Sequence, residues 1–93
     1  MKMKVSNLLT DESKWCQHAY ARDVVSEQVN ALSNLAASWC IVGAAARCGY
    51  NIDEYHDLTD KMLRETKMEI AQWQDRSERT FSMVRELLLR MGH

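Results

Sequence analysis

Cys16 and His18 lie two residues apart in this 93-residue chain. A base beside a thiol can lower the pKa of the thiol and make it a nucleophile. Residues two apart point to different faces of a helix, so this spacing alone does not aim the base at the sulfur. We therefore expect no enzyme, and a thiol-dependent enzyme that uses Cys16 is kept as the second alternative to the function that the sequence favours.

The other two cysteines do not have the spacing of a metal site. Cys40 and Cys48 are eight residues apart, which is about 12 Å along a helix and too far for both to bind one ion. The chain also lacks the glycine-rich loops that hold nucleotide phosphates. We expect no metal and no cofactor, and we expect the cysteines to be buried as small apolar side chains.

Arginine and tryptophan occur together twice in the chain. Trp15 precedes Arg22 in the first half, and Trp73 precedes Arg79 in the second. Such side chains can bind planar or phosphorylated ligands by stacking and by forked hydrogen bonds. Arginine–aspartate pairs and buried indoles also serve as structural braces, and we favour this interpretation. The candidate residues for binding a ligand or a partner are Trp15, Gln17, Arg22, Asp23, Trp73, Asp75, Arg79 and Thr80.

Charge and composition exclude several classes of protein. Twelve basic and thirteen acidic side chains give a formal net charge of −1, so we expect no general nucleic-acid binding. The longest apolar run, residues 36–46, is much shorter than the roughly 20 residues of a membrane-spanning helix. An odd number of cysteines and the lack of a leader pattern in residues 1–10 indicate reduced thiols in the cytoplasm.

Helices are expected to position these side chains, because proline is absent and glycine occurs at only three positions. Gly49 can close one helix, and Asn51 or Asp53 can cap the next. Before this boundary, apolar residues at three- and four-residue steps predict a helix from about 31 to 48. The later half of this helix is apolar on every side, which predicts a buried central helix.

An amphipathic helix is predicted after the boundary. Asp57 and Lys61 form an acid-before-base pair on its solvent side. His56 and His93 have no evident partner, and we expect both to be solvated. The apolar stripe of this helix consists of Tyr55, Leu58, Met62, Thr66, Ile70 and Trp73.

A last helix is predicted near the end of the sequence. Asp75 and Glu78 have the spacing of a capping box at its start. Met83 and Leu89 fall off its apolar face and are the candidate oligomer or partner surface. The apolar face itself consists of Phe81, Val84, Leu88 and Met91.

The N-terminal third has no clean hydrophobic period. Residues 5–9 predict one helical turn, and Thr10 or Asp11 can cap a second short helix that carries Trp15. Residues 23–29 mix β-branched and polar residues, and we interpret them as a loop or a short extended piece.

The predicted fold is mostly α, a single domain over residues 1–93. It is a small helical bundle around the buried central helix (about 31–48), with an irregular N-terminal segment. Asn30 or Ser33 is the predicted N-cap of the central helix.

Three segments resemble a family of small bacterial and bacteriophage proteins of unknown function. Residues 15–23, WCQHAYARD, are similar to its motif W-[TC]-[QK]-x-A-x-A-R-D, and residues 36–44, AASWCIVGA, are similar to A-x-x-W-C-x-x-G-A. Residues 73–84, WQDRSERTFSMV, resemble W-N-D-x-x-x-R-T-x-x-x-V, with Gln74 at the position of the asparagine. The resemblance implies a bacterial or phage protein in the host cytoplasm, and it implies no established activity.

The polar members of the first and third motifs are expected to converge where the N-terminal segment meets the last helix, as an internal network or as an anion pocket. Because catalytic constellations are lacking, we expect a small non-enzymatic interaction protein that is a homo-oligomer. By analogy with other small phage proteins, its partner would be a component of host defence. The first alternative is a binder of a small phosphorylated or nucleotide signal through Arg22, Arg79, Trp15 and Trp73.

Overall fold

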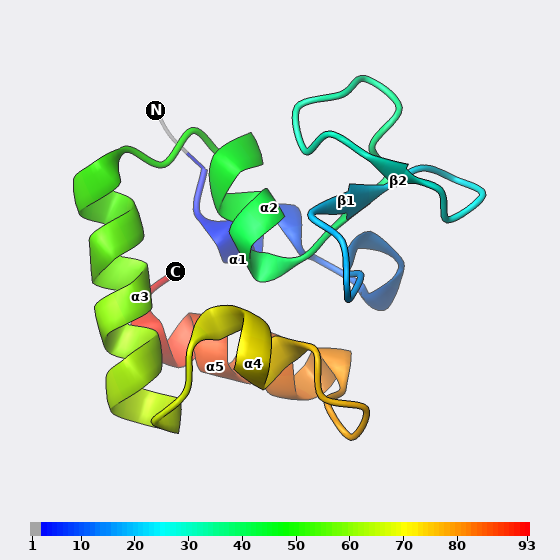
Figure 1. The fold of residues 1–93 in the computed structure, drawn as a ribbon. Coiled ribbons are helices and arrows are strands. Elements are labelled where there is room, and N and C mark those ends of the chain that lie inside the picture. Colours follow the sequence, from blue (N-terminus) through cyan, green and yellow to red (C-terminus); the bar gives the residue numbers. More distant parts are fainter. Residues whose placement is uncertain (1–2) are drawn as a thin grey trace.

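Helices and a small sheet share the chain in the computed structural model, which describes residues 3–93 (Figure 1). Met1 and Lys2, which belong to the segment predicted to lack a leader pattern, lie outside the described residues. The prediction of a mostly α bundle is confirmed only in part, because the chain also forms a small antiparallel sheet. The elements are α1 (Val5–Leu8), a 3-10 turn η1 (Glu12–Lys14), β1 (Ala21–Arg22), β2 (Gln28–Val29), β3 (Ser38–Trp39), α2 (Ile41–Arg47), α3 (Ile52–Thr66), α4 (Ile70–Gln74) and α5 (Phe81–Met91).

The helices pack around one apolar core. Helix α2 contacts α1 and α4, α1 contacts α5, and α3 contacts both α4 and α5. In Figure 1, α3 runs along one side of the molecule, α4 and α5 lie together below, and the sheet lies beyond α2 on the far side. The largest fully buried side chains are Leu9, Ile41, Leu58, Met62, Leu88, Val5 and Val84.

The sheet has the antiparallel order β2-β1-β3. Ala21 in the central strand pairs with Val29 on one side and with Trp39 on the other. Trp15 forms a bridge to Trp39, so the segment after η1 covers the outer edge of β3. The outer edge of β2 pairs with no other strand among residues 3–93.

The predicted helix from about 31 to 48 is wrong in its first half. Residues 31–37 form turns, and α2 begins only at Ile41. The side chains of Asn30 and Ser33 accept hydrogen bonds from the amides of Leu32 and Leu35, so they close turns instead of capping a helix. The predicted burial of the later half is confirmed, because α2 buries Ile41, Gly43, Ala44 and Ala45.

Helix α2 starts at Cys40 and ends at the predicted glycine boundary. The Cys40 sulfur accepts from the Gly43 amide and takes the place of the usual oxygen cap. Gly49 adopts a positive φ of 78°. Asn51 caps α3, and Glu54 completes a capping box with it.

The predicted amphipathic helix is divided in two. Helix α3 ends at Thr66 because Lys67 takes the left-handed conformation, with φ of 60°. The Thr66 hydroxyl donates to the Met62 carbonyl and accepts from the Met68 amide, which closes this end. The rest of the predicted stripe, Ile70 and Trp73, lies on α4 and is buried there.

The last helix has the predicted apolar face but a different start. Val84, Leu88 and Met91 are buried along α5. The N-cap is Thr80, whose side chain accepts from the Met83 amide, so the predicted cap at Asp75 is wrong.

The N-terminal third is irregular, as predicted. The helical turn over residues 5–9 is confirmed by α1, and residues 23–29 contain a turn followed by β2. Asp11 caps only the 3-10 turn η1, and the predicted second helix is wrong because Trp15 has extended backbone angles. Pairing of this region with β3 competes with helix formation and prevails.

Close packing of β1 on α2 requires glycine at position 43. A Cβ atom at Gly43 would overlap the backbone carbonyl of Tyr20, which directly precedes β1. This carbonyl also accepts a hydrogen bond from the Cys40 amide, so it cannot retreat without loss of that bond. The sheet and α2 therefore meet backbone to backbone.

We expect Gly43→Ala to lower the free energy of unfolding by about 1–3 kcal/mol or more, because the added methyl forces α2 and β1 apart. Urea unfolding measures the change. Ala46→Gly, at an exposed position of the same helix, is the control and should cost about 1 kcal/mol through helix propensity alone. If Gly43→Ala is no less stable than wild type, the close contact with β1 is refuted.

Candidate functional site

Gln17, Arg22 and Asp75 come together as the motifs predict. The Gln17 amide nitrogen donates to the carbonyls of Gln74, the last residue of α4, and of Arg76, two residues further on. The Asp75 carboxylate accepts from the His18 amide at 3.0 Å. Arg22 donates to the Gln17 carbonyl at 3.2 Å, so the N-terminal segment is fastened to the chain that leaves α4.

Gln74 connects this cluster to α2. Its side chain is 2% exposed, and its Oε1 accepts from the Ile41 amide at 2.8 Å. Ile41 is the first residue of α2, where the backbone amides have no partner within the helix. Gln74 supplies that partner, while its own carbonyl accepts from Gln17. Gln74, a residue of the third motif, is therefore hydrogen-bonded to one residue of the first motif and to one of the second.

Asp23 and Thr80 do not join the cluster. The Asp23 carboxylate accepts from the amides of Val25 and Glu27 and closes its own turn. Thr80 caps α5. The prediction that all the polar motif residues converge is wrong for these two, because each satisfies nearby backbone amides instead. It is wrong for Arg79 as well, whose guanidinium lies over the Trp73 ring.

Trp15 and Arg22 also lie apart from Trp73 and Arg79. They line a cleft of about 520 Å³ beside the turn after β1, together with Cys16 and Asp23. The Trp15 ring packs near Phe81, with centroids 6.4 Å apart, and its indole N–H is buried without a partner among the described residues. A single pocket built from both arginine–tryptophan pairs is therefore not formed.

Trp73 and Arg79 form a second site, on α4 and the loop after it. The Arg79 Nε donates to the Trp73 carbonyl at 2.8 Å, and its guanidinium lies 4.0 Å from the centroid of the Trp73 ring. A cleft of about 520 Å³ opens beside them. Met68, in the connection between α3 and α4, and Met83, on α5, line it together with other residues of α3 and α5. We call this cleft the Trp73–Arg79 cleft.

Two ion pairs flank the Trp73–Arg79 cleft. Arg76 pairs with Glu78 at 2.6 Å, and Arg90 pairs with Glu65 at 3.1 Å. The hydrogen bond from Arg76 lowers the pKa of Glu78, so this carboxylate is ionised at neutral pH. Across residues 3–93, no carboxylate is paired with Arg79. Its charge is therefore not taken up by an ion pair within the described residues.

Cys16 is not arranged as an activated nucleophile. Its Sγ donates to the Ala19 carbonyl at 3.7 Å, and burial raises the pKa of the thiol. His18 has a positive φ of 64°, and its Nδ1 lies 3.8 Å from Asp75. The described residues place no three metal-binding side chains together. None of the helices built from these residues has the length and apolar character needed to cross a membrane.

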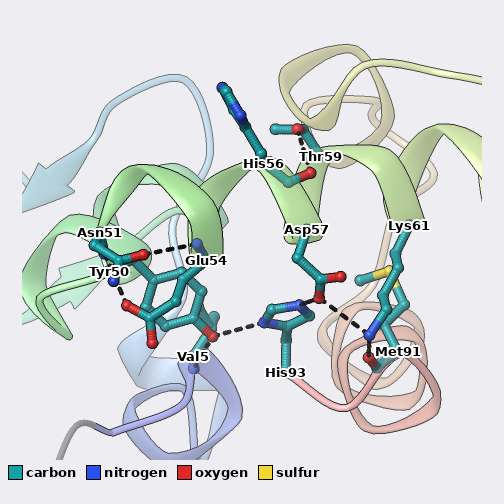
Figure 2. Close-up of polar contacts among 10 residues, drawn as sticks. All are labelled: Val5, Tyr50, Asn51, Glu54, His56, Asp57, Thr59, Lys61, Met91 and His93. Carbon is teal, nitrogen blue, oxygen red and sulfur yellow. Dashed lines mark hydrogen bonds and ion pairs between the residues drawn. The ribbon is translucent and has the colours of Figure 1, made fainter.

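His93 lies in a polar cluster that the sequence did not predict (Figure 2). Instead of being solvated as predicted, it is buried, with Tyr50 Oη 2.8 Å from Nδ1 and Asp57 Oδ2 2.8 Å from Nε2. The acceptor carboxylate assigns the proton to Nε2, so Nδ1 accepts from the Tyr50 hydroxyl. Burial raises the pKa of Tyr50, which keeps this hydroxyl protonated.

We call Tyr50, Asp57, Lys61 and His93 the His93 cluster. It connects both ends of the described chain to α3 and to Tyr50 just before it. Tyr50 Oη accepts from the Val5 amide at 3.3 Å. Lys61 Nζ pairs with Asp57 at 3.0 Å, which confirms the predicted acid-before-base pair, and donates to the Met91 carbonyl at 3.1 Å. The partners of His93 in this cluster come from distant parts of the chain, so no local pattern marks it.

The chain belongs to a family of unknown function, DUF6197, whose model matches residues 3–93. The match covers all three motifs and every element described above. No curated protein and no solved structure matches the chain.

We expect Gln74→Leu to lower the free energy of unfolding by about 1–3 kcal/mol, because the buried Ile41 amide then has no acceptor. Urea unfolding measures the change. Gln72→Leu is the matched control, since Gln72 lies exposed on the same helix and its replacement should cost less than about 0.5 kcal/mol. Equal effects of the two variants would contradict the assigned role of Gln74.

Two hydrogen bonds, the larger effect from Lys61 and the smaller from His93, lower the pKa of Asp57 below its ordinary 3.8. A lowered carboxyl pKa stabilises the fold above the ordinary value, and this stabilisation is lost as the pH falls below 3.8 through the folded-state pKa. Asp57→Asn should therefore lower the urea midpoint at pH 7, modestly because Asp57 is half exposed, and the difference should shrink in that acid window. Urea unfolding at graded pH measures this difference between wild type and Asp57→Asn, with Asp60→Asn as the control. A difference that stays constant as the pH falls would contradict the role assigned to the Asp57 carboxylate.

Proposed function

We propose that the chain is a small non-enzymatic interaction protein that binds a protein partner through the Trp73–Arg79 cleft. The observation that carries the proposal is the Arg79 guanidinium stacked 4.0 Å from the Trp73 ring centroid beside an open cleft. Tryptophan and arginine dominate the energetics of protein interfaces, and methionine is enriched there. Met68 and Met83 supply adaptable apolar surface to the same cleft.

The charges of the cleft favour a protein surface over a polyanion. Three arginines and three glutamates line it, and two of each are already paired with one another. Arg79 and Glu86 remain, one of each sign. This balance supports a partner that presents a carboxylate or a carbonyl to Arg79 beside apolar side chains, and it gives no support to general nucleic-acid binding.

Arg79 is held in place before any partner arrives. Its Nε is bound to the Trp73 carbonyl and its plane lies over the Trp73 ring, so little side-chain freedom is left to lose on binding. Association costs less entropy when the contact residues are already ordered. This arrangement supports a binding role for the cleft.

The partner is proposed to be a component of host defence in the bacterial cytoplasm. This step is an analogy with small single-domain phage proteins and rests on the motif resemblance, not on the cleft. The three free cysteines support a reducing compartment.

Met83→Glu should weaken partner capture by at least about tenfold, because it places a charge in the cleft without altering the core. Leu89→Glu is the matched control: Leu89 is exposed on the same helix, and it does not line the cleft. Quantitative capture from a bacterial lysate compares both variants with wild type. The proposal is abandoned if wild type captures nothing above background or if the two variants behave alike.

The alternative is a binder of a phosphorylated or nucleotide ligand at the same cleft. The unpaired Arg79 beside Trp73 favours it, but Arg22 and Trp15 line another cleft and cannot contribute. A thermal-shift screen against nucleotides separates the two functions, since a ligand at 100 times its Kd adds about 2.7 kcal/mol of stability. A shift that Arg79→Ala removes would favour this alternative over a protein partner.

A further inference from the structure

A further cleft, of about 450 Å³, is lined by residues of α2, of α4 and of the segment that precedes β1. Val42 of α2, Ala71 of α4 and Ala19 form apolar parts of its wall. Gln74, the last residue of α4, and Asp75, which follows it, supply polar groups. None of its lining residues is shared with the two clefts described above. We call it the Gln74–Asp75 cleft.

The fold uses only half of the Gln74 side-chain amide. Its Oε1 accepts from the Ile41 amide, which assigns the oxygen and turns Nε2 to the other side. Nε2 donates to no atom of residues 3–93. Among these residues the sealed side-chain atom without a partner is Trp15 Nε1, so the Nε2 of Gln74 is open to the cleft that this residue lines. Gln74 is 2% exposed, so this donor is fixed in place and faces a ligand.

The fold also uses only half of the Asp75 carboxylate. Oδ1 accepts from the His18 amide at 3.0 Å, whereas Oδ2 lies 3.8 Å from His18 Nδ1, which is too long for a hydrogen bond. No other group in residues 3–93 donates to Oδ2. The side chain is 28% exposed, so a ligand can reach this oxygen. The bond to the His18 amide orders the carboxylate in advance, and less entropy is then lost on binding.

The other lining residues determine which class of ligand fits. Neither lysine nor arginine occurs among the described residues that line the cleft, and Asp75 is the carboxylate among them. Phosphate is therefore disfavoured, because its recognition uses cationic side chains. The Tyr20 side chain lines the cleft and is 67% exposed, so its ring offers a face on which a planar ring can stack. These residues select a flat, uncharged molecule with an acceptor beside N–H donors.

We propose that the Gln74–Asp75 cleft binds the guanine base of a nucleoside. One edge of guanine carries the carbonyl O6 beside two N–H donors, N1–H and the 2-amino group. O6 accepts from Gln74 Nε2, and the two N–H donors bind the Asp75 carboxylate, whose Oδ1 keeps a second lone pair. The base stacks on the Tyr20 ring, as unpaired bases do on aromatic side chains. Guanine thus supplies partners to both of the polar groups that the fold leaves without one.

The same two groups discriminate between guanine and other bases. Adenine and cytosine offer the carboxylate one amino group beside a ring-nitrogen acceptor, so each lacks the second N–H donor. Hypoxanthine, the base of inosine, keeps O6 and N1–H and lacks the 2-amino group. A site that hydrogen-bonds an N–H group binds an analogue without it more weakly, because the polar group of the site is then left unpaired. Guanosine is therefore the nucleoside that this cleft prefers.

Titration with guanosine, adenosine and inosine, followed by NMR, tests this preference. Guanosine should shift the backbone amide signals of His18 and Asp75, and the other two nucleosides should bind at least about tenfold more weakly. The absence of binding at about 1 mM guanosine overturns the proposal, as does equal affinity for guanosine and adenosine. Arg79→Ala should leave guanosine binding unchanged, because Arg79 lines the other cleft. Guanosine binding that Arg79→Ala removes would also overturn the proposal, so the result is independent of the function proposed for the Trp73–Arg79 cleft.

Asp75→Asn separates the ligand contact from the fold. The variant keeps Oδ1 for the His18 amide and replaces Oδ2 by an NH2 donor, so guanosine affinity should fall at least about tenfold. Asp23→Asn is the matched control, because Asp23 also accepts backbone amides through Oδ1 and does not line the cleft. Circular dichroism checks that both variants fold.

Tyr20→Ala tests the stacking contact at an exposed position, where the change does not disturb the core. Loss of the ring should weaken guanosine binding at least about tenfold. Wild-type affinity in either Asp75→Asn or Tyr20→Ala would refute the site, as would an equal loss in Asp23→Asn.

Discussion

The hydrogen bond from the Ile41 amide to the side chain of Gln74 is the contact on which the rest of the structure depends. A buried helix start cannot leave its amides unpaired. The Cys40 sulfur caps the Gly43 amide of α2, and the Ile41 amide needs an acceptor from another element. Gln74 solves it from α4, and its carbonyl accepts from Gln17. The N-terminal segment, the central helix and the chain before α5 are thereby fixed to one another.

The proposed binding features follow from this arrangement. Because α4 is held against α2, Trp73 is buried in the core and Arg79 folds back over its ring beside the cleft. Because α2 is held in turn, the backbone of β1 lies directly on Gly43, and the sheet extends outward with β2 at its edge.

Local signals were predictable from the sequence, and contacts between distant segments were not. The Gly49–Asn51 boundary and the buried face of α5 depend on neighbouring residues, and both are confirmed. The side chains of Asn30 and Ser33 can cap a helix or close a turn with the same kind of hydrogen bond. Turns form here because Trp39 pairs with β1 as a strand, which a helix through this region would prevent. The convergence of Gln17, Arg22 and Asp75 was predictable because the motifs carry polar residues among core residues. His93 was missed because its partners lie 36 and 43 residues away.

Hydrogen exchange at the Ile41 amide tests the central contact most directly. In wild-type protein, NMR should show this amide exchanging only through global unfolding, as slowly as the core amides of α5. In Gln74→Leu the Ile41 amide should exchange through a local opening while the α5 amides keep most of their protection. Free exchange of the Ile41 amide in wild-type protein would contradict the account, since Gln74 would then not hold the start of α2.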